Sequence, residues 1–171
     1  MIGEELTGDI PFQPRARLLK LIGAELISDD VVAVTELVKN SHDADASVVT
    51  LTFRRASQED GELIITDDGT GMDRQTLLER WMQPAGSEKR ELGNRRTPGG
   101  RRMLGEKGVG RFASDKLAAR LELLSRRPDQ DVEIRACFDW DRFDAADTLL
   151  SEIRSRWEVR PATTIRRNGT I

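Results

Sequence analysis

Half of the glycines in this chain are gathered in one short stretch. Seven of the 14 glycines fall in the 25 residues from Gly86 to Gly110. This window holds seven lysines and arginines against three glutamates, although the whole chain carries a net charge of −3. A long loop inside a compact domain is usually functional. The window therefore predicts a loop that faces an anion, and phosphate is the anion that fits a basic, glycine-rich loop best.

Composition narrows the class of protein. The 171 residues, 37% apolar and 33% charged, predict one globular domain. No apolar run exceeds four residues and the acidic N-terminus lacks the features of a signal peptide, so we expect no membrane association. A single cysteine, Cys137, excludes an internal disulfide and fits a reducing cytoplasm. With His42 as its only histidine, the chain lacks the parts of most metal enzymes.

The order of predicted elements indicates the fold class. Helices come first, strands and helices then alternate, and strands end the chain, which favours a two-layer α/β sandwich with a mostly antiparallel sheet and helices on one face. Caps, apolar periodicity and turn residues predict these elements: helices at 14–26, 29–43, 73–82 and 111–120, and strands at 47–55, 62–66, 121–125, 132–140, 153–159 and 163–171.

The second predicted helix carries the first candidate site. Glu36, Asn40 and Asp43 follow one another at i, i+4 and i+7, which places them within about 60° of one another around the helix. One face then presents two carboxylates and an amide. The opposite side is expected to form core through Val31, Val34, Leu37 and Val38. The plain alternative is a solvated helix face.

Two glycine-rich turns form the other candidate sites. A predicted buried strand ends at Asp67 and runs into Asp68-Gly69-Thr70-Gly71-Met72, where a fixed carboxylate can accept a hydrogen bond from an exocyclic amine. The alternative is an ordinary turn built on Asp68. The second turn runs from Gly105 to Gly110 directly before a predicted helix, where backbone N–H groups can cradle phosphate. It is neither a Walker A loop nor a Rossmann glycine motif.

Taken in this order, the segments resemble the GHKL ATPase superfamily, which includes gyrase B subunits, ninety-kilodalton heat-shock chaperones, MutL proteins and sensor histidine kinases. Glu36 to Ala44 is similar to its N-box, Asp67 to Met72 to its first glycine box, Gly105 to Gly110 to its second, and Gly169-Thr170 to its late Gly-Thr pair. The resemblance covers nearly the whole chain. Within the superfamily, the sequence looks most like uncharacterised bacterial histidine kinase-like ATP-binding proteins. It implies a Bergerat fold, with a mixed sheet and a flexible ATP lid at 86–104.

The resemblance also implies a role for each matching residue. Glu36 would activate water as general base, and Asn40 would bind Mg²⁺. Asp67 would accept from the adenine N6 amine, and Asp43 would support the adenine end. The remaining cofactor-binding positions would be Gly69, Gly71, Met72, Gly105, Lys107, Gly108, Val109, Gly110 and Thr170.

The function implied is Mg²⁺-dependent ATP binding and slow hydrolysis, with the nucleotide state driving a conformational change or dimerisation. The alternatives are a histidine-kinase catalytic domain, which Glu36 argues against, and a nucleotide sensor that does not hydrolyse. The chain stops one residue past Gly169-Thr170, so we expect an N-terminal fragment of a longer protein with weak activity. An ATP-dependent homodimer of that longer protein, and a nucleic-acid or protein client, stay open.

Overall fold

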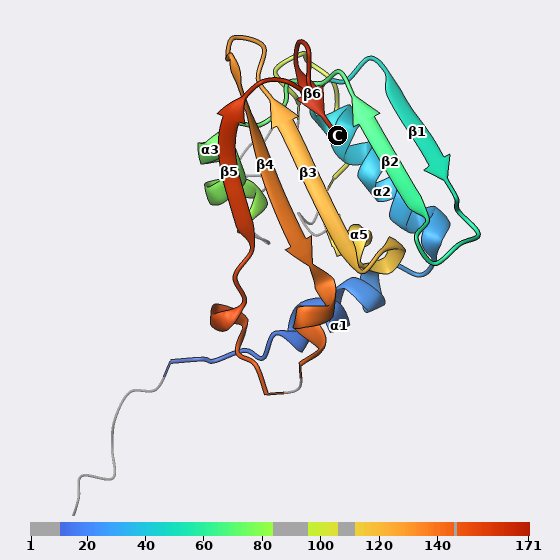
Figure 1. Cartoon of the computed structure of the whole chain (residues 1–171), viewed down its shortest axis with the longest axis vertical. Helices are drawn as coiled ribbons and strands as arrows, with labels where there is room; N and C mark the ends of the chain where they lie inside the picture. Colours follow the sequence, from blue (N-terminus) through green and yellow to red (C-terminus); the bar gives the residue numbers. More distant parts are fainter. Residues whose placement is uncertain (1–10, 84–95, 106–111, 146) are drawn as a thin grey trace, which may run out of the picture.

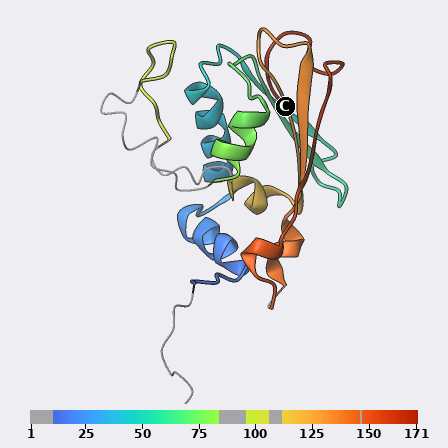
Figure 2. The ribbon, with the colours of Figure 1, turned by 90° about the vertical axis from the view of Figure 1, so that its left-hand side faces the viewer.

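The computed structural model describes residues 11–83, 96–105, 112–145 and 147–171. These residues form two layers, a six-stranded sheet and a layer of helices that covers one of its faces (Figures 1 and 2). The predicted two-layer α/β sandwich is confirmed. No helix in the described ranges is long and apolar enough to cross a membrane.

The sheet has the strand order β1-β2-β6-β3-β4-β5, so the last strand in the sequence lies between β2 and β3. Every strand pair in the described residues is antiparallel, where the family resemblance implied a mixed sheet. The strands are β1 (Val49–Arg54), β2 (Glu62–Asp67), β3 (Arg120–Arg126), β4 (Val132–Asp139), β5 (Arg156–Pro161) and β6 (Gly169–Thr170).

Aspartate caps begin two of the helical segments, as the sequence predicts. The Asp29 carboxylate accepts from the Val32 N–H at 2.9 Å, and the Asp73 carboxylate accepts from the Thr76 N–H at 2.7 Å. The helical elements are α1 (Arg17–Leu26), α2 (Asp30–Asp43), α3 (Arg74–Thr76), the π-helical turn η1 (Leu77–Trp81), α5 (Ala113–Leu117) and the 3₁₀ turns η3 (Trp140–Asp144) and η4 (Leu150–Glu152).

Three predicted elements are shorter than expected. The helix predicted at 111–120 is formed only by α5 in the described residues, because Ala118 is extended and Arg120 already pairs with Asp139 in the sheet. The strand predicted at 153–159 begins at Arg156, because η4 precedes it. The strand predicted at 163–171 is reduced to β6.

A buried carboxylate explains the late start of β6. Glu133 is fully buried, and its Oε2 accepts from the Thr164 and Ile165 N–H groups, each at 3.0 Å. These two N–H groups therefore cannot donate to a neighbouring strand. The segment before β6 folds as a loop over the sheet face that carries no helices.

Aromatic rings dominate the core between the sheet and the helices. Phe138 stacks on Trp140 at 5.9 Å between centroids, and Phe112 and Phe143 pack on the same indole. The valine side of α2 contributes less than predicted. Val31 is 75% exposed, and the buried residues of α2 are Ala33 and Ser41. The prediction that Val31 belongs to the core is wrong, because the side chain of this first-turn residue is exposed to solvent.

Candidate functional site

The first two predicted residues on α2 differ in their exposure to solvent. Glu36 is half-buried, and its Oε1 accepts from Lys39 Nζ at 2.6 Å one turn along the helix. Asn40 is exposed, and its side chain makes no hydrogen bond with another described residue. A carboxylate oriented by a lysine and a free amide therefore stand next to each other along α2.

Asp43, the third predicted residue on α2, has a buried side chain that holds backbone. Its Oδ1 accepts from the Leu104 N–H at 2.7 Å, and its Oδ2 accepts from the Gly105 N–H at 2.9 Å. Asp43 therefore fixes the start of the second glycine-rich turn against α2. The predicted support of an adenine end is not tested by these contacts and stays a prediction.

Asp67 lies at the end of β2 and joins three parts of the chain. Its Oδ2 accepts from the Ser41 hydroxyl of α2 at 3.0 Å, and its Oδ1 accepts from the Gly69 N–H at 2.9 Å. Its strand partner on the other side is Thr170 of β6. Burial raises the pKa of the Asp67 carboxyl, while the Gly69 and Ser41 hydrogen bonds act in the opposite direction. A carboxylate has about four lone-pair sites, so the Asp67 carboxylate can still accept from a further donor.

Two glycines permit the close approach of backbone segments beside Asp67. Gly71 has φ +61°, and a Cβ there would lie 2.0 Å from the Arg126 carbonyl oxygen. Gly169 has φ +122°, and a Cβ there would lie 1.9 Å from the Asp67 carbonyl oxygen. No other residue type fits these positions without a shift of backbone. The first glycine-rich turn and the Gly169-Thr170 pair are thus held together.

Ser125 is the hydrogen-bonding centre of this junction. Its fully buried hydroxyl oxygen accepts from the Met72 N–H at 2.8 Å and lies 3.1 Å from the Gly169 carbonyl and 2.9 Å from Thr170 Oγ1. If Ser125 donates its single proton to the Gly169 carbonyl, the Thr170 hydroxyl donates to Ser125. Thr170 Oγ1 then keeps lone pairs that can accept a hydrogen bond from a ligand or water.

A second aspartate at the end of α2 holds part of the predicted lid. Asp45, a non-glycine residue with φ +61°, accepts from the Thr97 hydroxyl, and its Oδ2 accepts from the Gly99 N–H at 2.8 Å. The Arg101 guanidinium donates to the Ala46 carbonyl. The hydrogen bond from Thr97 holds the pKa of Asp45 below its usual range. Residues 97–101 are therefore fixed to the same end of α2 that carries Asp43.

The structure thus brings together most of the described residues that the sequence predicts. Asp67, Gly69, Gly71, Met72 and Thr170 meet at the junction of β2, β3 and β6, and Asp43 and Gly105 meet beside α2. The predicted residues Lys107, Gly108, Val109 and Gly110, and residues 86–95 of the predicted lid, lie outside the described residues.

Sequence reasoning missed the residues that support the predicted ones, namely Ser41, Asp45, Thr97, Ser125 and Asn168. Asn168 Nδ2 donates to the Asp68 carbonyl at 2.8 Å and to the Gly69 carbonyl at 2.7 Å. Ser41 lies inside the predicted N-box, and Asp45 and Asn168 each stand directly next to a predicted motif, which is the signal that the sequence offers for these three.

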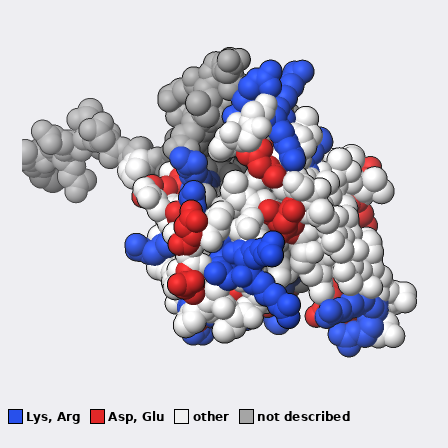
Figure 3. Space-filling view, turned by 90° about the horizontal axis from the view of Figure 1, so that it is seen from above, with Lys and Arg blue, Asp and Glu red and all other residues white. Residues whose placement is uncertain are grey.

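Charge around this end of the molecule is mixed. Viewed from the end at which β6 lies, basic and acidic side chains are interspersed (Figure 3). Within the described ranges, no group of three or more histidine, cysteine, aspartate or glutamate side chains could hold a metal ion.

Comparison with known proteins identifies a family. The family model described as histidine kinase-, DNA gyrase B-, and HSP90-like ATPase matches residues 28–170. The chain is also 30% identical to the chaperone protein HtpG of Rhizobium meliloti (strain 1021) over 138 residues, which cover 68% of this chain and 22% of that protein. The alignment thus spans about a fifth of the length of this relative.

Proposed function

The chain belongs to the histidine kinase-, DNA gyrase B- and HSP90-like ATPases, and on that basis we propose that it binds ATP and hydrolyses it slowly with Mg²⁺. The observation that carries the proposal is the arrangement around Asp67. A half-buried carboxylate at a strand end, bordered by close-packed glycine backbone and by the Thr170 hydroxyl, suits an adenine whose exocyclic amine donates to Asp67. Guanine carries a carbonyl in place of that amine, so the same carboxylate would repel it.

The phosphates would lie toward α2 and the second glycine-rich turn. Asp43 fixes the start of that turn through Leu104 and Gly105, and the family motif continues from there. Asp45 and Arg101 hold the neighbouring part of the lid. The anchoring side chains Asp43 and Asp45 lie at the C-terminal end of α2, seven and nine residues after the proposed general base Glu36. This proximity in one helix supports a phosphate site facing Glu36 and Asn40.

The residues present suit Mg²⁺. This ion prefers oxygen ligands and is usually held by one or two protein side chains together with phosphates and water. The exposed Asn40 amide, with no hydrogen bond to another described residue, offers such an oxygen. When bound, the ion would neutralise phosphate charge as the terminal phosphoryl group leaves. Glu36 would then accept a proton from the attacking water, with Lys39 holding one of its carboxylate oxygens.

Nucleotide binding is tested by the thermal unfolding midpoint of the chain with ATP, ADP or GTP, each with and without Mg²⁺. A ligand at 100 times its dissociation constant adds about 2.7 kcal/mol to the free energy of unfolding. For a domain of this size, this raises the midpoint by roughly 5 to 11 °C. We expect the shift with ATP and ADP and none with GTP. Equal shifts for ATP and GTP would contradict the role of Asp67.

Hydrolysis is tested by Glu36→Gln. We expect ATP binding to stay as in the wild type and turnover to fall by about 10² to 10⁴, the usual contribution of a general base. Glu59→Gln, at an exposed glutamate between β1 and β2, is the matched control and should leave both quantities unchanged. If turnover in Glu36→Gln equals the wild-type value while nucleotide still binds, the chain is a nucleotide-sensing module and not an ATPase.

A further inference from the structure

We propose that the free edge of β5 binds an extended peptide segment that alternates acidic and apolar residues, an interaction surface separate from the proposed nucleotide site. Within the described part of the chain, β5 pairs only with β4, so its other edge offers unpaired backbone N–H and C=O groups (Figure 1). Such an edge is a template for another strand, and side-chain pockets on either side of the edge then select the sequence that pairs.

On the sheet face that carries no helices, a groove of about 380 Å³ opens at the start of β5. Two acidic residues, Glu122 and Asp139, line this groove. It is also lined by four arginines, Arg120, Arg142, Arg154 and Arg156. Glu122 is already paired, since its Oε1 accepts from Arg135 Nε at 2.6 Å. The groove therefore carries an excess of positive charge.

The arginines keep that charge available. Arg120 and Arg156 are exposed, and their side chains make no hydrogen bond or ion pair with any other described residue. Arg142 Nη1 donates to the Arg154 carbonyl at 2.8 Å, and Arg154 Nη1 donates to the Ser151 carbonyl. These bonds orient two guanidinium groups without neutralising them. The groove is thus complementary to a carboxylate that enters from the edge of β5.

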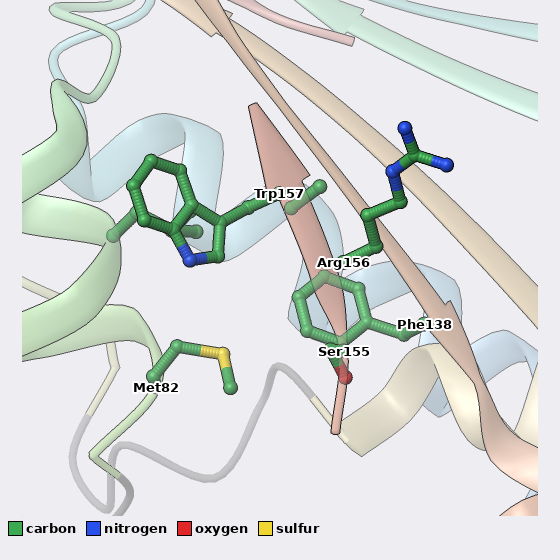
Figure 4. Close-up of a pocket in the computed structure, with 7 residues that line it drawn as sticks. Met82, Phe138, Ser155, Arg156 and Trp157 are labelled. Carbon is green, nitrogen blue, oxygen red and sulfur yellow. The ribbon is translucent and has the colours of Figure 1, made fainter. Parts of the chain in front are cut away.

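The other side of β5 is apolar. Trp157 and Val159 are 39% and 45% exposed, and Met82 beside them is 42% exposed. Arg74 lies over the Trp157 ring, 5.2 Å from its centroid, and fixes its orientation. Figure 4 shows Trp157 and Met82 on one side of the strand and the Arg156 side chain running to the other. Because side chains alternate along a strand, a paired peptide would place apolar residues by Trp157 and acidic residues by Arg156.

The opposite edge of the sheet does not offer this combination. β1 also exposes apolar side chains, with Phe53 62% exposed. Its charges are neutralised locally, since Arg54 lies 3.8 Å from Glu62 and Arg55 pairs with Asp60. Only the β5 edge joins exposed apolar side chains to unpaired arginines among the described residues. β1 is therefore the built-in control edge.

A peptide fits this surface better than a nucleic acid does. The backbone edge can pair with another peptide backbone, and a phosphodiester chain has no N–H donors of that spacing. The exposed aromatic ring of β5, Trp157, lies on the opposite side of the strand from Arg156, so bases could not stack on it beside the arginines of the groove.

The experiment uses the whole chain and a fluorescein-labelled peptide of eight residues in which glutamate and valine alternate. Fluorescence anisotropy should show binding that weakens with salt, and a peptide with glutamine in place of glutamate should bind at least about tenfold more weakly. Hydrogen exchange should slow in β5 on binding and stay unchanged in β1. Equal binding of both peptides, or no binding of either, would overturn the proposal.

Variants identify the surface. Arg156→Glu and Arg120→Glu should each weaken the glutamate peptide at least about tenfold, and Val159→Asp should weaken both peptides. Arg167→Glu, at an exposed arginine outside the groove, is the matched control. Unchanged thermal midpoints will show that the variants fold. Binding of a labelled DNA duplex that displaces the peptide and is lost in Arg156→Glu would assign the groove to a polyphosphate instead and overturn the proposal.

Discussion

Replacing Asp67 with asparagine should separate folding from ligand binding, with effects of opposite sign. Burial raises the pKa of Asp67, so the folded state holds the protonated form more readily than the unfolded chain does. The stability that Asp67 contributes is therefore greatest at low pH and is lost as the pH rises through its raised pKa. Asparagine has no charge to desolvate, and its oxygen can still accept from the Gly69 N–H. The unliganded Asp67→Asn variant should be at least as stable as the wild type at pH 7.

The affinity of the Asp67→Asn variant for ATP, in contrast, should fall. A hydrogen bond to a charged group contributes about 1.5 to 3 kcal/mol, so its weakening should raise the dissociation constant roughly 10- to 150-fold. At a ligand concentration of 100 wild-type dissociation constants, a 30-fold loss leaves the variant at about three, which adds only about 0.9 kcal/mol. The ATP-induced shift should fall from roughly 5 to 11 °C to roughly 2 to 4 °C.

The assay is differential scanning fluorimetry of both proteins with and without ATP, with calorimetric titration for the dissociation constants. Asp68→Asn is the matched control, because Asp68 Oδ1 accepts from the Ser47 and Val48 N–H groups and is not part of the proposed adenine contact. It should leave the ATP shift unchanged. A variant Asp67→Asn that keeps the full ATP shift would refute the assignment of Asp67 as the adenine partner.

Three further predictions concern the supports of the site. Gly71→Ala should lower the free energy of unfolding by several times the roughly 1 kcal/mol expected for Gly100→Ala in a thermal or denaturant titration, because both glycines have positive φ but only Gly71 meets the Arg126 carbonyl. Glu133→Gln should cost about 1.5 to 3 kcal/mol at pH 7. Burial alone would raise the pKa of Glu133, but hydrogen bonds from the Ile165 and Thr164 N–H groups outweigh it and lower the pKa. The stability that Glu133 contributes is therefore lost as the pH falls below about 4.3. In denaturant titrations, the variant should not show this part of the loss of stability in acid. Asp45→Asn should speed amide hydrogen exchange at Gly99 and leave the thermal midpoint nearly unchanged, since the carboxylate holds a surface turn and not the core.

Local signals in the sequence predicted the caps, the motifs and most strands. Asp29 and Asp73 begin their helices because a side-chain oxygen beside an N-terminal turn depends only on neighbours in the chain. The first glycine box follows β2 directly, so its place at the strand end was also local information. The family resemblance implied that Asp67 and Thr170 both contact the nucleotide, and in the structure the two residues are strand partners.

The features that the sequence did not predict depend on distant contacts. The strand predicted from residue 163 is a loop because Glu133, about thirty residues earlier, takes two of its N–H groups. Nothing in the sequence of β4 distinguishes Glu133 from a solvated glutamate. Ser125 and Asp45 were missed for the same reason, since their partners are 44 or more residues away. Periodicity assigned Val31 to the core, because it identifies the apolar side of a helix. It does not show whether other parts of the fold cover the first turn of that helix.

The two halves of the sheet are joined only through the short strand β6 in the described residues. In the described residues, β1 and β2 form one ribbon and β3, β4 and β5 another, and the backbone pairing between them runs through β6, with Asp67 opposite Thr170 on one side and Ser125 and Arg126 on the other. Because β6 is so short, the two ribbons can shear or twist against each other more easily than the strands within either ribbon can. The proposed adenine contacts straddle this strand, because Asp67 belongs to one ribbon while Ser125, which holds the Met72 backbone and Thr170, belongs to the other. A molecule bound there would contact both ribbons and restrain their relative motion. Its release would allow the two ribbons to move against each other again.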